Sequence, residues 1–128
     1  MNLLLDTHAA LWWWAGAGEL SSAASTAIAA PTNSVWFSAA SAYEIVQKVR
    51  IGKLSIPASL ANDFVGAVLQ EGWRPLPISL QSAARAATIR HPHRDPFDRI
   101  LAAQCEERSF TLVTIDPVFS GLGTPVLW

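Results

Sequence analysis

The sequence predicts an α/β protein with a short, mostly parallel β-sheet and helices on both faces. Apolar runs at residues 3–5, 35–37 and 111–115 are short and continuous, as expected for strands buried on both faces. Segments with helical spacing of apolar residues lie between them, so strands and helices alternate. The length of 128 residues suits one domain, which we expect to span residues 1–128.

Local signals set the bounds of each element. Thr7 and Ser79 are candidate N-caps, and Pro57 and Pro96 suit the first turn of a helix. In chain order we expect strands at 3–5, 35–37, 76–78, 111–115 and 126–128, and helices at 8–16, 22–31, 41–53, 57–71, 79–89 and 96–108.

The composition excludes several classes of protein. Hydrophobic residues make up 51% of the chain, charged residues 15%, and the net charge is -1. These values exclude a disordered, collagen-like or coiled-coil chain. They also exclude a globally basic protein, so a nucleic acid must be held by a local patch or through metal ions.

The lone Cys105 excludes an internal disulfide framework and a cysteine-rich zinc site. No apolar stretch approaches the roughly 18 residues that span a bilayer, and no leader pattern opens the chain. We therefore expect a cytoplasmic protein without membrane contact.

Two aspartates directly follow predicted strands. Asp6 follows residues 3–5 and Asp116 follows residues 111–115, which places both at the carboxyl edge of a parallel sheet, where ligands bind. The alternative is that each one only caps the next helix, and for either residue alone we favour that alternative.

Asp98 shares a predicted helix face with Leu101, Ala102 and Cys105, so its carboxylate points toward the core. An ionised carboxylate there needs a cation or hydrogen-bond donors. We therefore assign Asp98 mainly to a site, and Asp95 mainly to capping the helix that Pro96 begins.

Glu44 falls opposite Ile45, Val46 and Val49 on its helix and precedes Lys48 by four residues. Spacing alone favours an exposed Glu–Lys pair. The preceding run of small residues, 38–42, would let this helix start close to the sheet and turn Glu44 toward Asp6.

Several carboxylates drawn together in an apolar fold repel one another, and hard divalent cations relieve that repulsion. Mg²⁺ and Mn²⁺ take carboxylate and water oxygens and support phosphodiester chemistry. Basic residues near Asp98 could hold flanking phosphates of RNA, although a solvated loop explains them equally well: Arg90, His93, Arg94 and Arg99. Zinc binding by His91 and His93 is disfavoured, since they lack a second matched pair.

Trp12, Trp13 and Trp14 cannot all face inward on one helix, so we expect at least one to be exposed. An exposed tryptophan here is better explained by a dimer or partner interface than by stacking on a base. For Tyr43, packing is favoured over stacking on a base.

Four motifs in order resemble the PIN-domain ribonucleases of the VapC toxin family. They are Leu-Leu-Leu-Asp6-Thr-His, Ser41-Ala-Tyr-Glu44-Ile, His93-Arg-Asp95-Pro-Phe-Asp98-Arg and Leu112-Val-Thr114-Ile-Asp116. Each motif is weak alone, but their order and spacing extend over essentially the whole chain.

The resemblance implies a PIN-like three-layer α/β/α sandwich and an Mg²⁺- or Mn²⁺-dependent endoribonuclease that cleaves structured RNA such as tRNA or rRNA. It further implies a VapB-like antitoxin as inhibitor and a homodimer. Asp6, Glu44 and Asp98 match the three core metal-site acids, and Asp116 matches the fourth, more variable one. Thr7 and Thr114 match supporting positions.

His8 stands where many PIN domains carry Asn or Ser, and Tyr43 stands where the related subgroup often has Trp. Neither change removes an acid. A phosphoacceptor receiver domain is a weaker alternative, because Asp6 is alone after its strand and the lysines, at 48 and 53, lie early. A catalytically silent PIN-like module that binds RNA or protein remains open.

Overall fold

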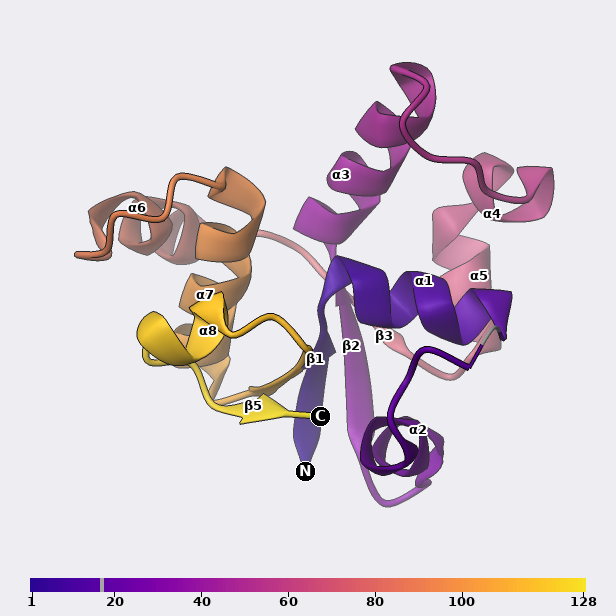
Figure 1. Ribbon diagram of the computed structural model, residues 1–128, viewed down its shortest axis with the longest axis horizontal. Coiled ribbons are helices and arrows are strands. Elements are labelled where there is room, and N and C mark those ends of the chain that lie inside the picture. The colour runs from indigo at the N-terminus through magenta and orange to yellow at the C-terminus, as the bar shows by residue number, and fades with distance from the viewer. Residues whose placement is uncertain (17) are drawn as a thin grey trace.

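The computed structural model describes residues 1–16 and 18–128, and within them five strands form one sheet in the order β3-β2-β1-β4-β5. The strands are β1 (Asn2–Leu5), β2 (Ser34–Ser38), β3 (Arg74–Leu76), β4 (Thr111–Val113) and β5 (Val126–Leu127). The helices are α1 (Thr7–Ala15), α2 (Ser22–Ala29), α3 (Ala39–Arg50), α4 (Ala58–Asn62), α5 (Phe64–Gln70), α6 (Leu80–Thr88), α7 (Pro96–Arg108) and α8 (Val118–Gly121). All pairings are parallel, which confirms the predicted α/β class (Figure 1).

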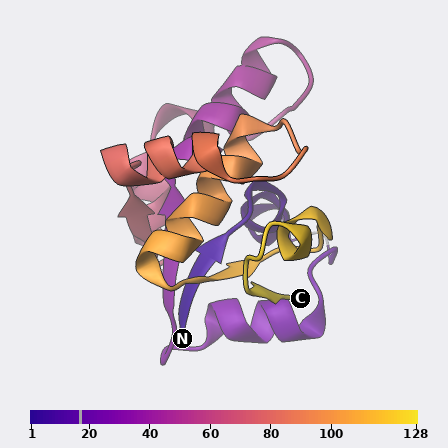
Figure 2. The same ribbon diagram turned by 90° about the vertical axis from the view of Figure 1, so that its left-hand side faces the viewer.

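Alternate residues of the central strand enter two different cores, as strand geometry requires. Leu3 and Leu5 pack in a core with α1, α2 and Val68 of α5, whereas Leu4 packs in a second core with α7 and Phe119 of α8. Figure 2 shows α6, α7 and α8 in front of the sheet. The sheet therefore lies between two helical layers, as the three-layer prediction stated.

Several elements differ from the predictions. The expected helix at 57–71 is two helices, because the Asp63 side chain accepts a hydrogen bond from the Gly66 amide at 2.8 Å and begins a new helix. The third strand lies at 74–76 rather than 76–78, since it pairs Arg74 with Trp36. The short helix α8 was not predicted, and β4 ends at Val113, before Thr114.

The strand order also excludes the receiver-domain alternative. In receiver domains the first strand lies between the second and third, whereas here β1 lies between β2 and β4. Because β1 is central, the residues that follow it come close to those that follow its two neighbours. No described helix has the length and apolar character needed to cross a membrane.

Candidate active site

Asp6 lies at the carboxyl end of the central strand and is only 7% exposed. Its carboxylate Oδ2 accepts a hydrogen bond from Thr114 Oγ1 at 2.8 Å, which matches the supporting position predicted for Thr114. It occupies the N-cap position of α1 but forms no capping hydrogen bond with its side chain, so the capping alternative is wrong for Asp6. Burial raises the pKa of Asp6, the hydrogen bond from Thr114 opposes that increase, and the nearby Glu44 charge makes a smaller contribution in the raising direction.

Glu44 is buried, contrary to the exposed position that helical spacing favoured. The buried residues of α3 are Ala40, Ser41, Glu44 and Ile45, while Val46 is 48% exposed. The Glu–Lys pair does form, with 2.9 Å between Lys48 Nζ and Glu44 Oε2. The buried face of α3 therefore combines the small residues Ala40 and Ser41 and the carboxylate of Glu44 with the apolar Ile45.

Asp98 lies in the first turn of α7, half-buried, 2.7 Å from Nε2 of His93. Burial raises the pKa of Asp98 to about 6, opposed by the His93 hydrogen bond and assisted by the charges of Asp95 and Asp6. Asp95 caps α7 by accepting from the Phe97 amide at 2.9 Å and the Asp98 amide at 3.4 Å, as predicted. Asp98 and Glu44 thus both lie within electrostatic reach of Asp6.

Asp116 has a weaker connection to the other acids. Its amide donates to Thr114 Oγ1 at 3.0 Å, so Thr114 links it to Asp6. Its carboxylate Oδ1 accepts from the Val118 amide at 3.0 Å and so supports the start of α8. The capping alternative therefore describes Asp116 better than Asp6.

The segments that carry the acids are joined by buried polar contacts. The spacing of residues in the sequence did not indicate these contacts. Thr7 Oγ1 donates to Ser41 Oγ at 3.0 Å, and Ser38 Oγ donates to Gln104 Oε1 at 2.7 Å. The run of small residues at 38–42 was the visible signal for Ser38 and Ser41. The sequence signal for Gln104 was weaker: it is a polar residue close to Leu101 and Cys105 on the predicted helix.

The basic loop before α7 divides into anchoring and exposed residues. The Arg99 guanidinium donates to the carbonyls of Ala86 at 2.8 Å, His91 at 3.1 Å and His93 at 3.0 Å, and to that of Ile89. Arg99 therefore holds the loop, and His93 is engaged with Asp98. Of the four predicted RNA contacts, Arg90 and Arg94 are exposed.

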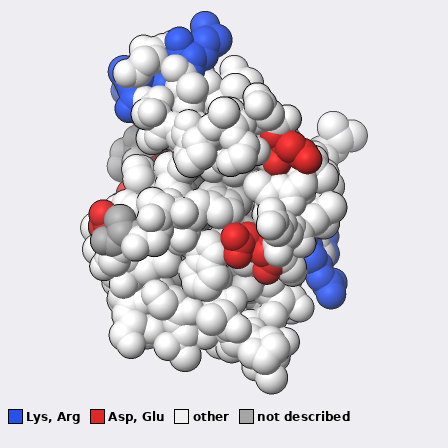
Figure 3. Space-filling view, turned by 90° about the vertical axis from the view of Figure 1, so that its right-hand side faces the viewer, with Lys and Arg blue, Asp and Glu red and all other residues white. Residues whose placement is uncertain are grey.

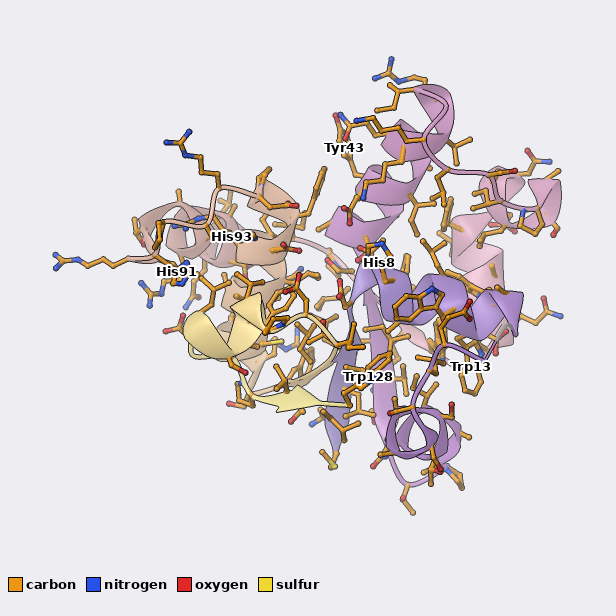
Figure 4. The ribbon with its side chains drawn as sticks, viewed as in Figure 1. His8, Trp13, Tyr43, His91, His93 and Trp128 are labelled. Atoms are coloured by element: carbon orange, nitrogen blue, oxygen red, sulfur yellow. The ribbon has the colours of Figure 1, made fainter. Side chains whose placement is uncertain are left out.

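Across the site from His93, the exposed His8 lies at the start of α1 (Figure 4). Its imidazole is 5.7 Å from the Trp12 ring, and its charge lowers the pKa of Asp6. Tyr43 of α3 packs against Phe97 of α7, with 5.7 Å between ring centroids, although Tyr43 is 62% exposed.

The three tryptophans are all half-buried, so the prediction that one is exposed is wrong. Trp14 packs in the core against Phe37, while the Trp13 indole donates to Glu71 Oε2 at 2.9 Å. Trp12 contacts the ring of Trp128, at 5.7 Å. Neighbouring segments therefore cover more faces of α1 than the pattern of apolar residues along this helix predicts.

The donors at this edge are suited to a hard cation. Among the described residues, no group of three or more His, Cys, Asp and Glu side chains is placed so that it could hold a metal ion by itself. Mg²⁺ usually needs only one or two carboxylates, with waters and substrate phosphates completing its shell. Asp6 and Asp98, with raised pKa values and no Lys or Arg ion pair in the described chain, fit that requirement.

The chain belongs to the PIN domain family, whose match extends over residues 3–124. PIN domains are generally nucleases, in agreement with the acidic edge. A search of curated proteins finds no significant match.

Three solved structures have a similar fold. VapBC2 from Rickettsia felis, in a complex bound to a DNA fragment from its promoter, matches with a TM-score of 0.73 and 14% identity, covering 99% of this chain and 98% of that one. A toxin-antitoxin complex from Klebsiella pneumoniae matches with a TM-score of 0.64, 19% identity and coverages of 98% and 96%. FitAcB from Neisseria gonorrhoeae matches with a TM-score of 0.59, 20% identity and the same coverages.

Proposed function

We propose that this protein is the toxin of a VapBC-type system, a divalent-metal-dependent endoribonuclease that cleaves structured RNA such as tRNA or rRNA. One observation carries the proposal: the buried Asp6 carboxylate ends the central strand within electrostatic reach of Glu44 and Asp98. Ionised carboxylates in this arrangement are costly without a cation. PIN membership and the toxin-antitoxin complexes of similar fold support the assignment.

Asp6, Glu44 and Asp98 would hold Mg²⁺ or Mn²⁺, directly or through water, with Asp116 completing the set. A divalent cation there supplies positive charge for the scissile phosphate and a water of lowered pKa. Thr114 keeps the Asp6 carboxylate oriented, and Lys48 keeps Glu44 paired. The exposed Arg90 and Arg94 would attract flanking phosphates. We expect products with 5′-phosphate and 3′-hydroxyl ends.

The test is cleavage of total RNA by purified, antitoxin-free protein with Mn²⁺, with EDTA as the metal-free arm. The matched control for Asp6→Asn is Asp63→Asn, because Asp63 is exposed and an asparagine keeps its capping oxygen. We expect Asp6→Asn and EDTA to abolish cleavage and Asp63→Asn to leave it unchanged. Sequencing the 5′ ends of the fragments identifies the RNA. Activity of Asp6→Asn at the wild-type rate would refute the assignment, and an inactive wild type that still binds RNA would favour the silent module.

A groove beside the acidic edge supports an antitoxin as partner. A cavity of about 410 Å³ lies between α1 and the segment before α4, with Trp12 and Leu54 on its apolar wall and Lys48 and Lys53 also lining it. Figure 3 shows that the face built by α1, α4 and α5 is mostly uncharged, with a few Asp and Glu side chains on it and Lys and Arg only at its margins. An apolar segment of a VapB-like protein would cover this surface. In co-expression with a candidate antitoxin, Trp12→Ala should weaken the complex and restore RNA cleavage.

A second apolar surface supports a homodimer. A pocket of about 280 Å³ with apolar lining, which includes Phe64 and the exposed Val65, lies between α3 and α5. Val46 of α3 and Leu69 of α5 are also about half exposed. Several exposed apolar side chains of this kind are typical of a protein–protein interface. Sedimentation should give a dimer for wild type and a monomer for Val65→Glu with Leu69→Glu. A monomeric wild type would contradict this part of the proposal.

A further inference from the structure

Gln104 is a polar side chain in the interior of α7, with 1% of its surface exposed. Its neighbours Ala103 and Cys105 are equally buried. A buried amide is costly unless its polar atoms are paired. Here Oε1 accepts from Ser38 Oγ at 2.7 Å, and Nε2 donates to the Pro77 carbonyl at 3.4 Å. Both ends of the amide are therefore used, and both reach outside α7.

The main partner of Gln104 is the residue that begins the helix carrying Glu44. Ser38 is the last residue of β2 and the N-cap of α3, where its hydroxyl also accepts from the Ala40 amide at 3.0 Å. Ser38 is fully buried. Gln104 thus connects α7, which carries Asp98, to the start of α3, which carries Glu44.

A second buried contact joins α3 to the segment that carries Asp6. Thr7, next to Asp6, donates to Ser41, which lies one turn before Glu44 on the same face of α3. Hydrogen bonds between buried side chains therefore connect the three segments that carry the acids. Without such contacts, the mutual repulsion of the carboxylates favours separation of α3 from α7.

We propose that Gln104 is a positioning residue, which sets the separation of Glu44 and Asp98 by holding Ser38. The inference rests on the proposed metal-dependent function. A metal site requires its donors within about 0.5 Å of the productive geometry, and residues behind the ligands commonly supply that precision. Gln104 touches neither substrate nor metal in this role.

The experiment compares Mn²⁺ affinity, measured by titration calorimetry, with RNA cleavage. Gln104→Met keeps the length of the side chain and removes both hydrogen bonds. We expect a Kd for Mn²⁺ about 10–100-fold higher than in wild type, and a lower kcat with an unchanged KM for RNA. Ser38→Ala should also lower the affinity. The losses of the two single variants should not add fully in the double variant, because both remove the Ser38–Gln104 hydrogen bond, while each also removes one further contact.

Cys105→Ala is the matched control, since Cys105 is the next residue of α7, is equally buried and forms no side-chain hydrogen bond among the described residues. It should lower the melting temperature and leave Mn²⁺ affinity within about twofold of wild type. Equal losses of affinity in Cys105→Ala and Gln104→Met would overturn the inference, because general loosening of the core would then suffice.

The remaining outcomes separate the inference from the proposed function. If wild type binds Mn²⁺ and Gln104→Met binds it equally, positioning by Gln104 is wrong and the metal-dependent function stands. If folded wild type binds no Mn²⁺ and cleaves no RNA, the proposed function fails, and the inference fails with it.

Discussion

The two ends of α1 are built on opposite principles. At its end, Trp14 packs against Phe37 at 5.4 Å and Trp73 at 5.3 Å between ring centroids, in a cluster without charge. At its start, the buried residues are polar, and the pKa of Asp6 is raised because burial disfavours its ionised form. Apolar area at one end stabilises the fold, while the buried carboxylates at the other end cost stability, a cost that the proposed cation would offset.

The largest expected effect tests the aromatic cluster at the C-terminal end of α1. Trp73 is 3% exposed and contacts the rings of both Trp13 and Trp14. Trp73→Ala should lower the free energy of unfolding by about 3–5 kcal/mol, because it leaves a cavity in the aromatic cluster. Urea unfolding measures this change. The folded variant should bind Mn²⁺ as wild type does, and a large loss of affinity would show that the two ends are coupled.

The next effect tests the acidic end. Asp6→Asn should reduce RNA cleavage roughly a hundredfold or more, since it removes a charged donor at the centre of the site. In EDTA, its unfolding free energy at pH 7 should equal or exceed that of wild type, because a costly buried charge is gone. Urea unfolding of both proteins in EDTA checks the second part. A clearly less stable Asp6→Asn protein would mean that Asp6 is structural.

A smaller effect concerns pH. The pKa of Asp98 is raised from 3.8 to about 6, so between these values the folded protein keeps a proton that the unfolded chain has lost. The stabilising contribution is full below about pH 4 and is lost as the pH rises through about 6. In EDTA at pH 7, Asp98→Asn should therefore be more stable than wild type by about 1–2 kcal/mol. The two should converge near pH 4, and parallel stability curves would contradict the raised pKa.

The smallest effect concerns Asp116, whose carboxylate already accepts a hydrogen bond from Val118. Asp116→Ala should lower the free energy of unfolding by about 1 kcal/mol, because it removes the hydrogen bond that supports the start of α8, whereas Asp116→Asn keeps an acceptor oxygen and should not lower it. Both should reduce cleavage much less than Asp6→Asn does. Thermal unfolding and cleavage assays of the pair distinguish the two roles, and an inactive but stable Asp116→Asn would place Asp116 beside Asp6 in importance.

Spacing along the chain was a good guide to some acids and a poor guide to others. Asp98 could be predicted as a site residue, because a charge on an apolar helix face conflicts with its surroundings. The place of Asp6 at the end of a strand could also be predicted, but that position alone favoured a capping role, and the assignment of Asp6 to the site came from the resemblance to the PIN-domain ribonucleases. Glu44 could not be placed from periodicity, which put Val46 inward and Glu44 outward, the reverse of the structure. The position of α3 at the sheet edge decides that orientation, and helical periodicity contains no information about it.

The sequence by itself determined the parallel α/β class, the strand-end placement of Asp6 and the capping role of Asp95, because these depend on residues near one another in the chain. Only the tertiary structure decided that His93 pairs with Asp98, that Arg99 anchors the loop, and that Gln104 holds Ser38. Such contacts depend on how a helix lies against a loop or another helix. That geometry comes from packing of the whole core, which no local pattern encodes.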